Sequence, residues 1–239
     1  MGDDGASLTH STPSVLTGHT GTVRCIAWLG EHSSPGSNLL MSAGAGDCAV
    51  RLWDAERGVC VSRLSGHTGA IQAAAVSDDF SLFATGDKDG QVRMWDVRSH
   101  SAVCNARMGG EVLSLAFNHG SSHIAAGFAD GWCRVYDASG LGEASCLRPH
   151  DTEIRSISFV QDQTGEVLFS GSFDGTIAVS DAETGELVQR IAGHADRVVQ
   201  VWLLPLTRSP QDCTTAFPTP QIQMSTPRHA LLHAQTRMQ

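Results

Sequence analysis

Three sets of residues in this sequence have types and spacings that could support chemistry. His119 and His123 stand four positions apart, the interval at which two histidines on one helix face hold zinc. Residues 44–47, Gly-Ala-Gly-Asp, have the glycine content of a phosphate-binding loop. His67 and Asp89 are the residue types of an acid–base pair. The sequence therefore raises a metal site, a nucleotide site and a catalytic site as hypotheses.

The surroundings of each set argue against that chemistry. Residues 118–122 have the composition of a turn, so His119 and His123 are not expected to share a helix face. The Gly-Ala-Gly-Asp segment lacks the Gly-Lys-Ser/Thr that completes a phosphate loop. No nucleophile accompanies His67 and Asp89 in the pattern. We expect a protein that is not an enzyme and that carries no cofactor and no metal.

The cysteines give no site either. The seven are Cys25, Cys48, Cys60, Cys104, Cys133, Cys146 and Cys213. None forms a Cys-x-x-Cys pair, so neither a zinc site nor a redox motif is indicated. An odd number of cysteines in a chain without a leader peptide is typical of a reducing compartment. No apolar run in the sequence approaches the roughly 18 residues that a membrane span needs. We expect a soluble, cytoplasmic protein, with nuclear and cytoskeletal or ciliary locations as alternatives.

The charge balance bears on the class of partner. The chain has 16 Lys and Arg against 25 Asp and Glu, a formal net charge of −9, and no run of basic residues. Because phosphate backbones are held by basic faces, nucleic acid is not an expected partner. Other proteins or peptides remain, with no membrane association.

Two series of dipeptides reveal an internal repeat. Trp53-Asp54, Trp95-Asp96, Tyr136-Asp137 and Ser180-Asp181 follow one another at intervals of 42, 41 and 44 residues. A second series precedes them in the same phase: Gly18-His19, Gly66-His67, Gly109-Gly110, Pro149-His150 and Gly193-His194. A period in the low forties indicates a repeat architecture in which each unit packs on its neighbours.

Each unit divides into four short strands. In the second unit we predict strands at Ile71–Ser77, Ser81–Gly86, Gln91–Asp96 and Ala102–Met108. Alternation such as Val-Arg-Met-Trp at 92–95 places every second side chain on one face of a sheet. The predicted fold class is all-β.

The Gly-His and Trp-Asp series at this period resembles the WD40-repeat family. The resemblance implies an incomplete β-propeller of four full blades and the start of a fifth. The repeats span about 16–58, 64–103, 107–141, 147–186 and a truncated 191–203, within a partial propeller at 13–203. Residues 1–12 are predicted to be a disordered N-terminus.

The family resemblance also implies a buried hydrogen-bond chain in each blade, formed by His, Ser or Thr, Asp and Trp. On this sequence the full set falls only in unit two, as His67, Thr85, Asp89 and Trp95. The partial sets are His19, Asp47 and Trp53 in unit one, Asp130 in unit three, and His150, Ser170 and Asp174 in unit four. Unit one has Ala43 at the hydroxyl position, and unit four has Ser180 at the Trp position.

The pattern stops after residue 203. Residues 204–239 hold five of the eight prolines and no strand alternation, so we interpret them as disordered or as a non-native C-terminus, with a genuine extra element as the third alternative. Four blades and one strand would leave sheet edges unpaired. We therefore expect the isolated chain to be marginally stable, and a longer isoform or another chain to complete the ring.

A binding surface is expected where the His-bearing connections and Asp-bearing turns meet, since WD40 proteins commonly hold peptides there. The candidate partner-binding residues on that face are Phe128, Phe173, Asp87, Lys88 and Arg197. An exposed turn Phe indicates a contact surface, and the alternative is that both rings fold inward between blades.

Two narrower resemblances give this scaffold role more concrete forms. Met94–Arg98 resembles the Trp-Asp-x-Arg box of substrate receptors of cullin-RING ubiquitin ligases, where Arg98 would contact an adaptor. The series Cys133–Asp137, Pro149-His150, Ile154–Phe159, Ala178–Asp181 and His194–Gln200 resembles the C-terminal propeller of nemitin-like, microtubule-associated WD-repeat proteins. The second resemblance implies a scaffold linked to microtubules or cilia, although an acidic chain does not favour direct contact with acidic tubulin tails.

Overall fold

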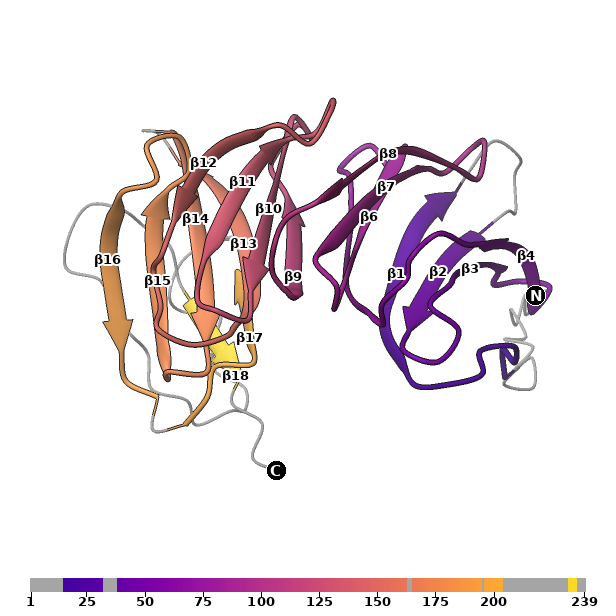
Figure 1. Ribbon diagram of the computed structural model, residues 1–239, viewed down its shortest axis with the longest axis horizontal. Coiled ribbons are helices and arrows are strands. Elements are labelled where there is room, and N and C mark those ends of the chain that lie inside the picture. Colours follow the sequence, from indigo (N-terminus) through magenta and orange to yellow (C-terminus); the bar gives the residue numbers. More distant parts are fainter. Residues whose placement is uncertain (1–14, 32–37, 163–164, 195, 204–231, 236–239) are drawn as a thin grey trace, which may run out of the picture.

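The computed structural model describes residues 15–31, 38–162, 165–194, 196–203 and 232–235 of the 239-residue chain, and all of its regular elements are strands (Figure 1). None of the described residues forms a helix that is long and apolar enough to cross a membrane. The predictions for residues 1–12, 204–231 and 236–239 fall outside the described residues.

Sixteen of the strands form four antiparallel sheets, which are the blades. Blade one contains β1 (Val23–Glu31), β2 (Asn38–Gly44), β3 (Val50–Asp54) and β4 (Val59–Leu64). Blade two contains β5 (Ile71–Val76), β6 (Leu82–Asp87), β7 (Gln91–Asp96) and β8 (Ser101–Arg107). Blade three contains β9 (Val112–Phe117), β10 (His123–Phe128), β11 (Cys133–Asp137) and β12 (Glu143–Leu147), and blade four contains β13 (Ile154–Asp162), β14 (Gly165–Ser172), β15 (Thr176–Asp181) and β16 (Leu187–Ala192).

The strand order within each blade follows the chain, so the first strand of a blade is its inner strand and the fourth is its outer edge. The inner strands contact one another in succession, β1 with β5, β5 with β9 and β9 with β13. Figure 1 shows the blades fanned in an arc from blade one to blade four. The all-β, four-blade prediction is confirmed, and the strands predicted in unit two begin and end within one residue of β5 to β8.

Apolar side chains fill the seams between blades. Leu29, Met41 and Leu52 from blade one pack with Phe83 and Trp95 from blade two in one cluster. Because side chains alternate between the two faces of a strand, each blade offers one apolar face to the blade before it and the other to the blade after it. The core of the molecule is therefore a series of sheet-on-sheet seams.

In the described part of the chain, one face of blade one is not covered by another blade. Ile26 and Trp28 on β1 are 65% and 44% exposed. Their register partners on β2 place them where Ala74 and Val76 lie on β5, and Ala74 and Val76 pack against blade one. Blade one therefore carries the residues of a blade seam on a face that the described residues leave open.

The fifth unit consists of β17 (Gln200–Leu203) paired with β18 (Leu232–Gln235). Val201 of β17 packs on blade four. β18 lies within residues 204–239, for which disorder, a non-native C-terminus and a genuine extra element are the alternatives, and its four residues pair with β17. The pairing follows from the open hydrogen-bonding edge that β17 presents.

Candidate functional site

In blade two a chain of side-chain hydrogen bonds links Trp95 on β7 and Thr85 on β6 to His67, which precedes β5. The indole Nε1–H of Trp95 donates to Thr85 Oγ1 at 2.8 Å, and Thr85 Oγ1 lies 2.7 Å from His67 Nε2. The other ring nitrogen, His67 Nδ1, lies 2.7 Å from Asp87 Oδ2. This order of donors and acceptors fits a neutral imidazole that accepts from Thr85 and donates to the carboxylate.

The carboxylate of this chain is Asp87, and the prediction of Asp89 was wrong. Asp87 ends β6 with a fully buried side chain directed at His67, whereas Asp89 lies two residues further along the turn and is exposed. Asp89 instead accepts a hydrogen bond from Thr68 Oγ1 at 3.0 Å. Since Asp87 is completely enclosed, the structure also excludes it as a partner-binding residue.

Burial sets the ionisation of His67. Removal of the ring from water lowers the pKa of His67, and this effect outweighs the hydrogen bond and charge of Asp87, which act to raise it. The positive charge of Arg93 lowers the pKa further. His67 is therefore a structural histidine held neutral at neutral pH.

Blade one has a complete chain that the sequence prediction missed. Ser42 Oγ lies 2.8 Å from His19 Nε2 and accepts from Trp53 Nε1 at 2.7 Å, while His19 Nδ1 lies 3.0 Å from Asp47 Oδ1. The hydroxyl is thus Ser42, and Ala43 faces the seam with blade two. Burial acts to raise the pKa of Asp47, but the hydrogen bond and charge of His19 and the charge of Arg51 outweigh it and lower the pKa.

Blade four keeps three members of the chain. His150 Nδ1 lies 2.9 Å from Asp174 Oδ2, and His150 Nε2 lies 2.9 Å from Ser170 Oγ. Ser180 occupies the Trp position, is buried, and its hydroxyl has no hydrogen-bond partner among the described residues. Arg190 of β16 donates to the backbone oxygen of Pro149, next to His150.

In blade three, contacts of a single arginine, Arg134, with two aromatic rings take the place of the hydrogen-bond chain. Arg134 donates to the backbone oxygen of Met108 at 2.6 Å, and its guanidinium carbon lies 5.2 Å from the ring centroid of Phe128 and 6.0 Å from that of Trp132. Phe128 is only 1% exposed, so the prediction that it contacts a partner was wrong and the inward alternative holds. The predicted Asp130 is exposed and accepts from the backbone N–H of Trp132.

The other residues considered for chemistry do not assemble a site. His119 pairs with Asp78 at 2.9 Å in a turn, while His123 begins β10 and contacts Ser122. In the described part of the chain no three His, Cys, Asp or Glu residues are arranged to hold a metal ion. Burial raises the pKa of the Cys25 thiol to about 12, so it is not an activated nucleophile.

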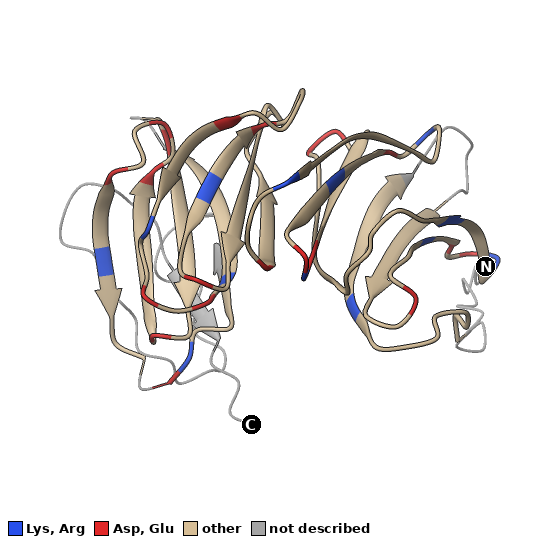
Figure 2. Cartoon of the chain, viewed as in Figure 1, with Lys and Arg blue, Asp and Glu red and all other residues tan. Residues whose placement is uncertain are grey.

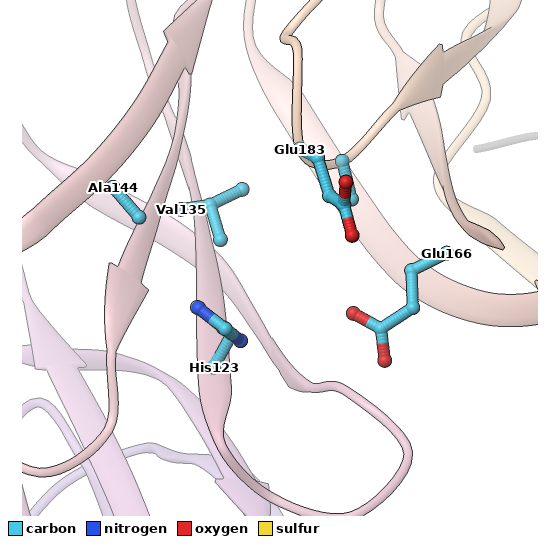
Figure 3. Close-up of a pocket in the computed structure, with 6 residues that line it drawn as sticks. His123, Val135, Ala144, Glu166 and Glu183 are labelled. Atoms are coloured by element: carbon cyan, nitrogen blue, oxygen red, sulfur yellow. The ribbon is translucent and has the colours of Figure 1, made fainter.

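One small cavity lies between blades three and four. It has a volume of about 80 Å³ and is lined by His123, Val135, Ala144, Glu166, Ala182 and Glu183. Figure 3 shows the side chains of His123, Glu166 and Glu183 around this space. Glu166 accepts both of its hydrogen bonds from Asn118, at 2.8 and 3.0 Å. The carboxylate therefore ties the two blades together at this point.

The face that carries the β2–β3, β6–β7, β10–β11 and β14–β15 turns, here termed the turn face, has an ordered polar rim. Arg24 Nη1 donates to Gln72 Oε1 at 2.6 Å, and Gln72 Nε2 donates to Glu111 Oε1 at 2.7 Å. This chain crosses blades one, two and three. The sequence prediction missed Arg24 and Gln72, although both occupy the second position of an inner strand.

An irregularity of the inner strands directs these residues. The register of β1 shifts between Val23 and Cys25, that of β5 between Ile71 and Ala73, and that of β13 between Ile154 and Ser156. The residues at the three shifts are Arg24, Gln72 and Arg155. A bulge leaves its extra residue outside the ladder and re-aims its side chain, so the repeat places polar groups at equivalent points of the rim.

The predicted partner-binding residues divide by position. Lys88 and Arg197 are exposed on the turn face, and Phe173 is half-buried there. Arg98 is exposed in the β7–β8 turn, at the opposite end of the strands. Figure 2 shows acidic and basic residues interspersed over the blades rather than gathered in one patch of a single sign. The turn face therefore offers varied polar contacts.

An arc of four-stranded antiparallel blades that pack through their inner strands defines the β-propeller class, and blades one, two and four each contain a His–hydroxyl–carboxylate chain. The family model of the WD domain, G-beta repeat, matches residues 11–54, 58–96, 102–137 and 143–181. The chain belongs to the WD40 family.

Curated relatives share this repeat. The chain is 29% identical over 167 residues to the small ribosomal subunit protein RACK1y of Oryza sativa subsp. japonica, covering 68% of this chain and 48% of the relative. It is 30% identical over 187 residues to a guanine nucleotide-binding protein subunit beta of Arabidopsis thaliana, covering 73% and 48%. It is 30% identical over 153 residues to a WD repeat-containing protein 55 homolog of Dictyostelium discoideum, covering 64% and 36%. The chain thus spans about half or less of the length of these relatives.

Proposed function

We propose that this chain is a non-catalytic scaffold segment that binds other proteins or peptides through its turn face. The observation that carries the proposal is the rim chain Arg24–Gln72–Glu111, with donor–acceptor distances of 2.6 and 2.7 Å across three blades. Side chains held in this way lose little conformational entropy when a partner binds, and lower entropy loss favours affinity.

Membership of the WD40 family supports the proposal, because WD-repeat proteins are generally protein-interaction scaffolds. The histidines, carboxylates and hydroxyls that could have served catalysis instead satisfy one another inside blades one, two and four. They are positioning groups for the turns that bear the rim.

Ring completion is part of the same proposal. The open face of blade one carries Ile26 and Trp28, and apolar groups of this size are normally covered by another sheet. The chain spans about half the length of the RACK1y and G-beta relatives. Further blades, from a longer form of this chain or from another chain, would cover that face and complete the ring.

Quantitative affinity purification tests the scaffold role. The 239-residue chain is compared with Lys88→Glu, on the turn face, and with Arg57→Glu, an exposed arginine of the β3–β4 turn at the opposite end. We expect Lys88→Glu to lose partners that the native chain and Arg57→Glu retain. Equal recovery of every partner by all three proteins would exclude the turn face as the binding surface.

Exposure of Arg98 favours a second candidate function, docking to the adaptor of a cullin-RING ligase. An adaptor that binds the native chain and not Arg98→Ala would support this role, and the absence of adaptor binding would end it.

The nemitin-like resemblance supports a microtubule-linked scaffold in the cytoplasm or cilium as a narrower form of the main proposal. Co-sedimentation with microtubules in cell extract tests that form, and recovery entirely in the supernatant would contradict it.

A further inference from the structure

Phe173 holds two arginines on the turn face. Its ring is half-buried in the turn between β14 and β15. The guanidinium carbon of Arg155 lies 4.8 Å from the ring centroid, and that of Arg197 lies 4.8 Å from the same centroid. The two guanidinium carbons are therefore within twice that distance of each other. A single aromatic ring thus brings together two positive groups from separate segments, β13 and the residues before β17.

Of the two arginines, Arg155 is paired with a carboxylate, and Arg197 is the one that can bind an external anion. Arg155 Nε lies 2.9 Å from Glu153 Oε2, so Arg155 has an acidic partner. Asp196 Oδ1 accepts the backbone N–H of Arg197 at 2.7 Å and is engaged with that backbone group. Among the described residues, no ion pair includes the guanidinium of Arg197, which is exposed.

Stacking on an aromatic ring prepares a guanidinium for recognition of an anion. Contact with the ring restricts the motion of the group, and a guanidinium presents its five N–H donors as a planar fork. That fork matches the two oxygens of a carboxylate. Arg155 occupies the same bulge position as Arg24 and Gln72, so a ligand bound here also lies at the polar rim.

We propose that Phe173, Arg155 and Arg197 form a binding site for the carboxylate of an Asp or Glu side chain in a partner peptide. Arg197 is the main donor, Arg155 adds positive charge that Glu153 partly balances, and Phe173 holds both groups in place. The inference rests on the proposed scaffold function, since it names the chemistry of the partner that the turn face would bind.

Peptide binding to the full 239-residue chain tests this site. The probes are three fluorescent libraries of ten-residue peptides that differ only at a fixed central residue, which is Glu, Gln or phosphoserine. We expect selection of the Glu library and loss of about tenfold in affinity on Arg197→Ala, as for a lost hydrogen bond to a charged group. Arg57→Ala should bind as the native chain does.

Two further variants separate recognition from folding. Arg197→Lys keeps the charge but not the fork, so it should bind more weakly than the native chain and more tightly than Arg197→Ala. Phe173→Leu should lose about threefold through loss of the stacked ring. Equal binding of the Glu and Gln libraries, binding of phosphoserine alone, or no binding of any library would overturn the inference. Partner recovery that depends on Lys88 would still support the scaffold role in each of those cases.

Discussion

His67 Nδ1 and Asp87 Oδ2 lie 2.7 Å apart, and the two side chains are 1% and 0% exposed. Asp87 also accepts the backbone N–H groups of Asp89 and Gln91. Asp87→Ala would leave the buried His67 and the two partly buried backbone N–H groups unpaired, so we expect it to lower the free energy of unfolding by about 3 kcal/mol. Asp89→Ala removes an exposed contact and should cost less than about 1 kcal/mol.

Urea denaturation of the two variants beside the native chain measures this difference. Equal losses, or a larger loss for Asp89→Ala, would show that Asp87 is not the carboxylate that supports His67.

Ser42 joins His19 and Trp53 through one hydroxyl oxygen. Ser42→Ala leaves two buried ring nitrogens without their partner, so we expect a loss of about 2 to 3 kcal/mol in the free energy of unfolding. Ser65→Ala is the matched control, because Ser65 is exposed and accepts a hydrogen bond from the side chain of Arg63. A loss for Ser42→Ala no larger than that of the control would remove Ser42 from the chain in blade one.

Ser180 is a buried hydroxyl without a hydrogen-bond partner among the described residues. Removal of an unsatisfied polar atom from an apolar site is favourable, so Ser180→Ala should raise the free energy of unfolding by about 1 kcal/mol. Ser170→Ala in the same blade should do the opposite, because Ser170 Oγ bonds His150. Thermal denaturation compares the two, and destabilisation by Ser180→Ala would show that the Ser180 hydroxyl does form a hydrogen bond.

Stability should fall on mild acidification because of His67. Its pKa is lowered by burial, so the unfolded chain binds the proton more readily than the folded chain does. The stability that His67 contributes is therefore complete above the ordinary histidine pKa of about 6.5 and is lost as the pH falls below it. The lowered pKa values of Asp47 and Asp174 act below their ordinary value of 3.8, outside this window.

Free energies of unfolding measured between pH 7.5 and pH 5 check this direction. The decline should be smaller in His67→Gln than in the native chain and should persist in His100→Asn, a substitution in the β7–β8 turn where Asn tolerates the positive φ of 53°. An increase in stability on acidification would contradict the assignment of a neutral His67.

The open face of blade one should tolerate polar substitutions that a seam between blades would not. Ile26→Thr with Trp28→Thr removes apolar surface that is 65% and 44% exposed. The free energy of unfolding should change by less than about 1 kcal/mol, while binding of a hydrophobic dye and concentration-dependent self-association should decrease. The equivalent change Ala74→Thr with Val76→Thr, within a seam, should be destabilising. Loss of stability in the blade-one variant would show that the face is already covered.

The repeat pattern was sufficient to predict the blades, because the Trp-Asp positions recur at intervals of 42, 41 and 44 residues even where the Trp itself is replaced by Tyr136 or Ser180. The hydrogen-bond partners depended on details that spacing does not reveal. Six residues separate the paired Ala43 and Val50 of blade one, and five separate the paired Gly86 and Val92 of blade two. Ser42 therefore stands eleven residues before Trp53, whereas Thr85 stands ten before Trp95. The choice between Asp87 and Asp89 depended on which carboxylate the end of β6 buries.

The side-chain contacts on the turn face were harder to predict from the sequence than the blades. Phe173 was predicted as a contact residue, but its two arginines come from segments 18 and 24 residues away and meet only in the folded blade. Phe128 has the same residue type near an equivalent turn, yet Arg134 and the seam enclose it. Composition alone does not distinguish these two rings, because the difference lies in the neighbouring blade.

Site-specific photo-crosslinking tests the scaffold proposal most directly. A benzophenone side chain is introduced in place of Lys88 on the turn face, and in a second protein in place of Arg98 at the opposite end of the strands. After irradiation in cell extract, we expect discrete crosslinked proteins from position 88 and none of the same proteins from position 98. Identical crosslinks from both positions, or crosslinks from position 98 alone, would contradict binding through the turn face.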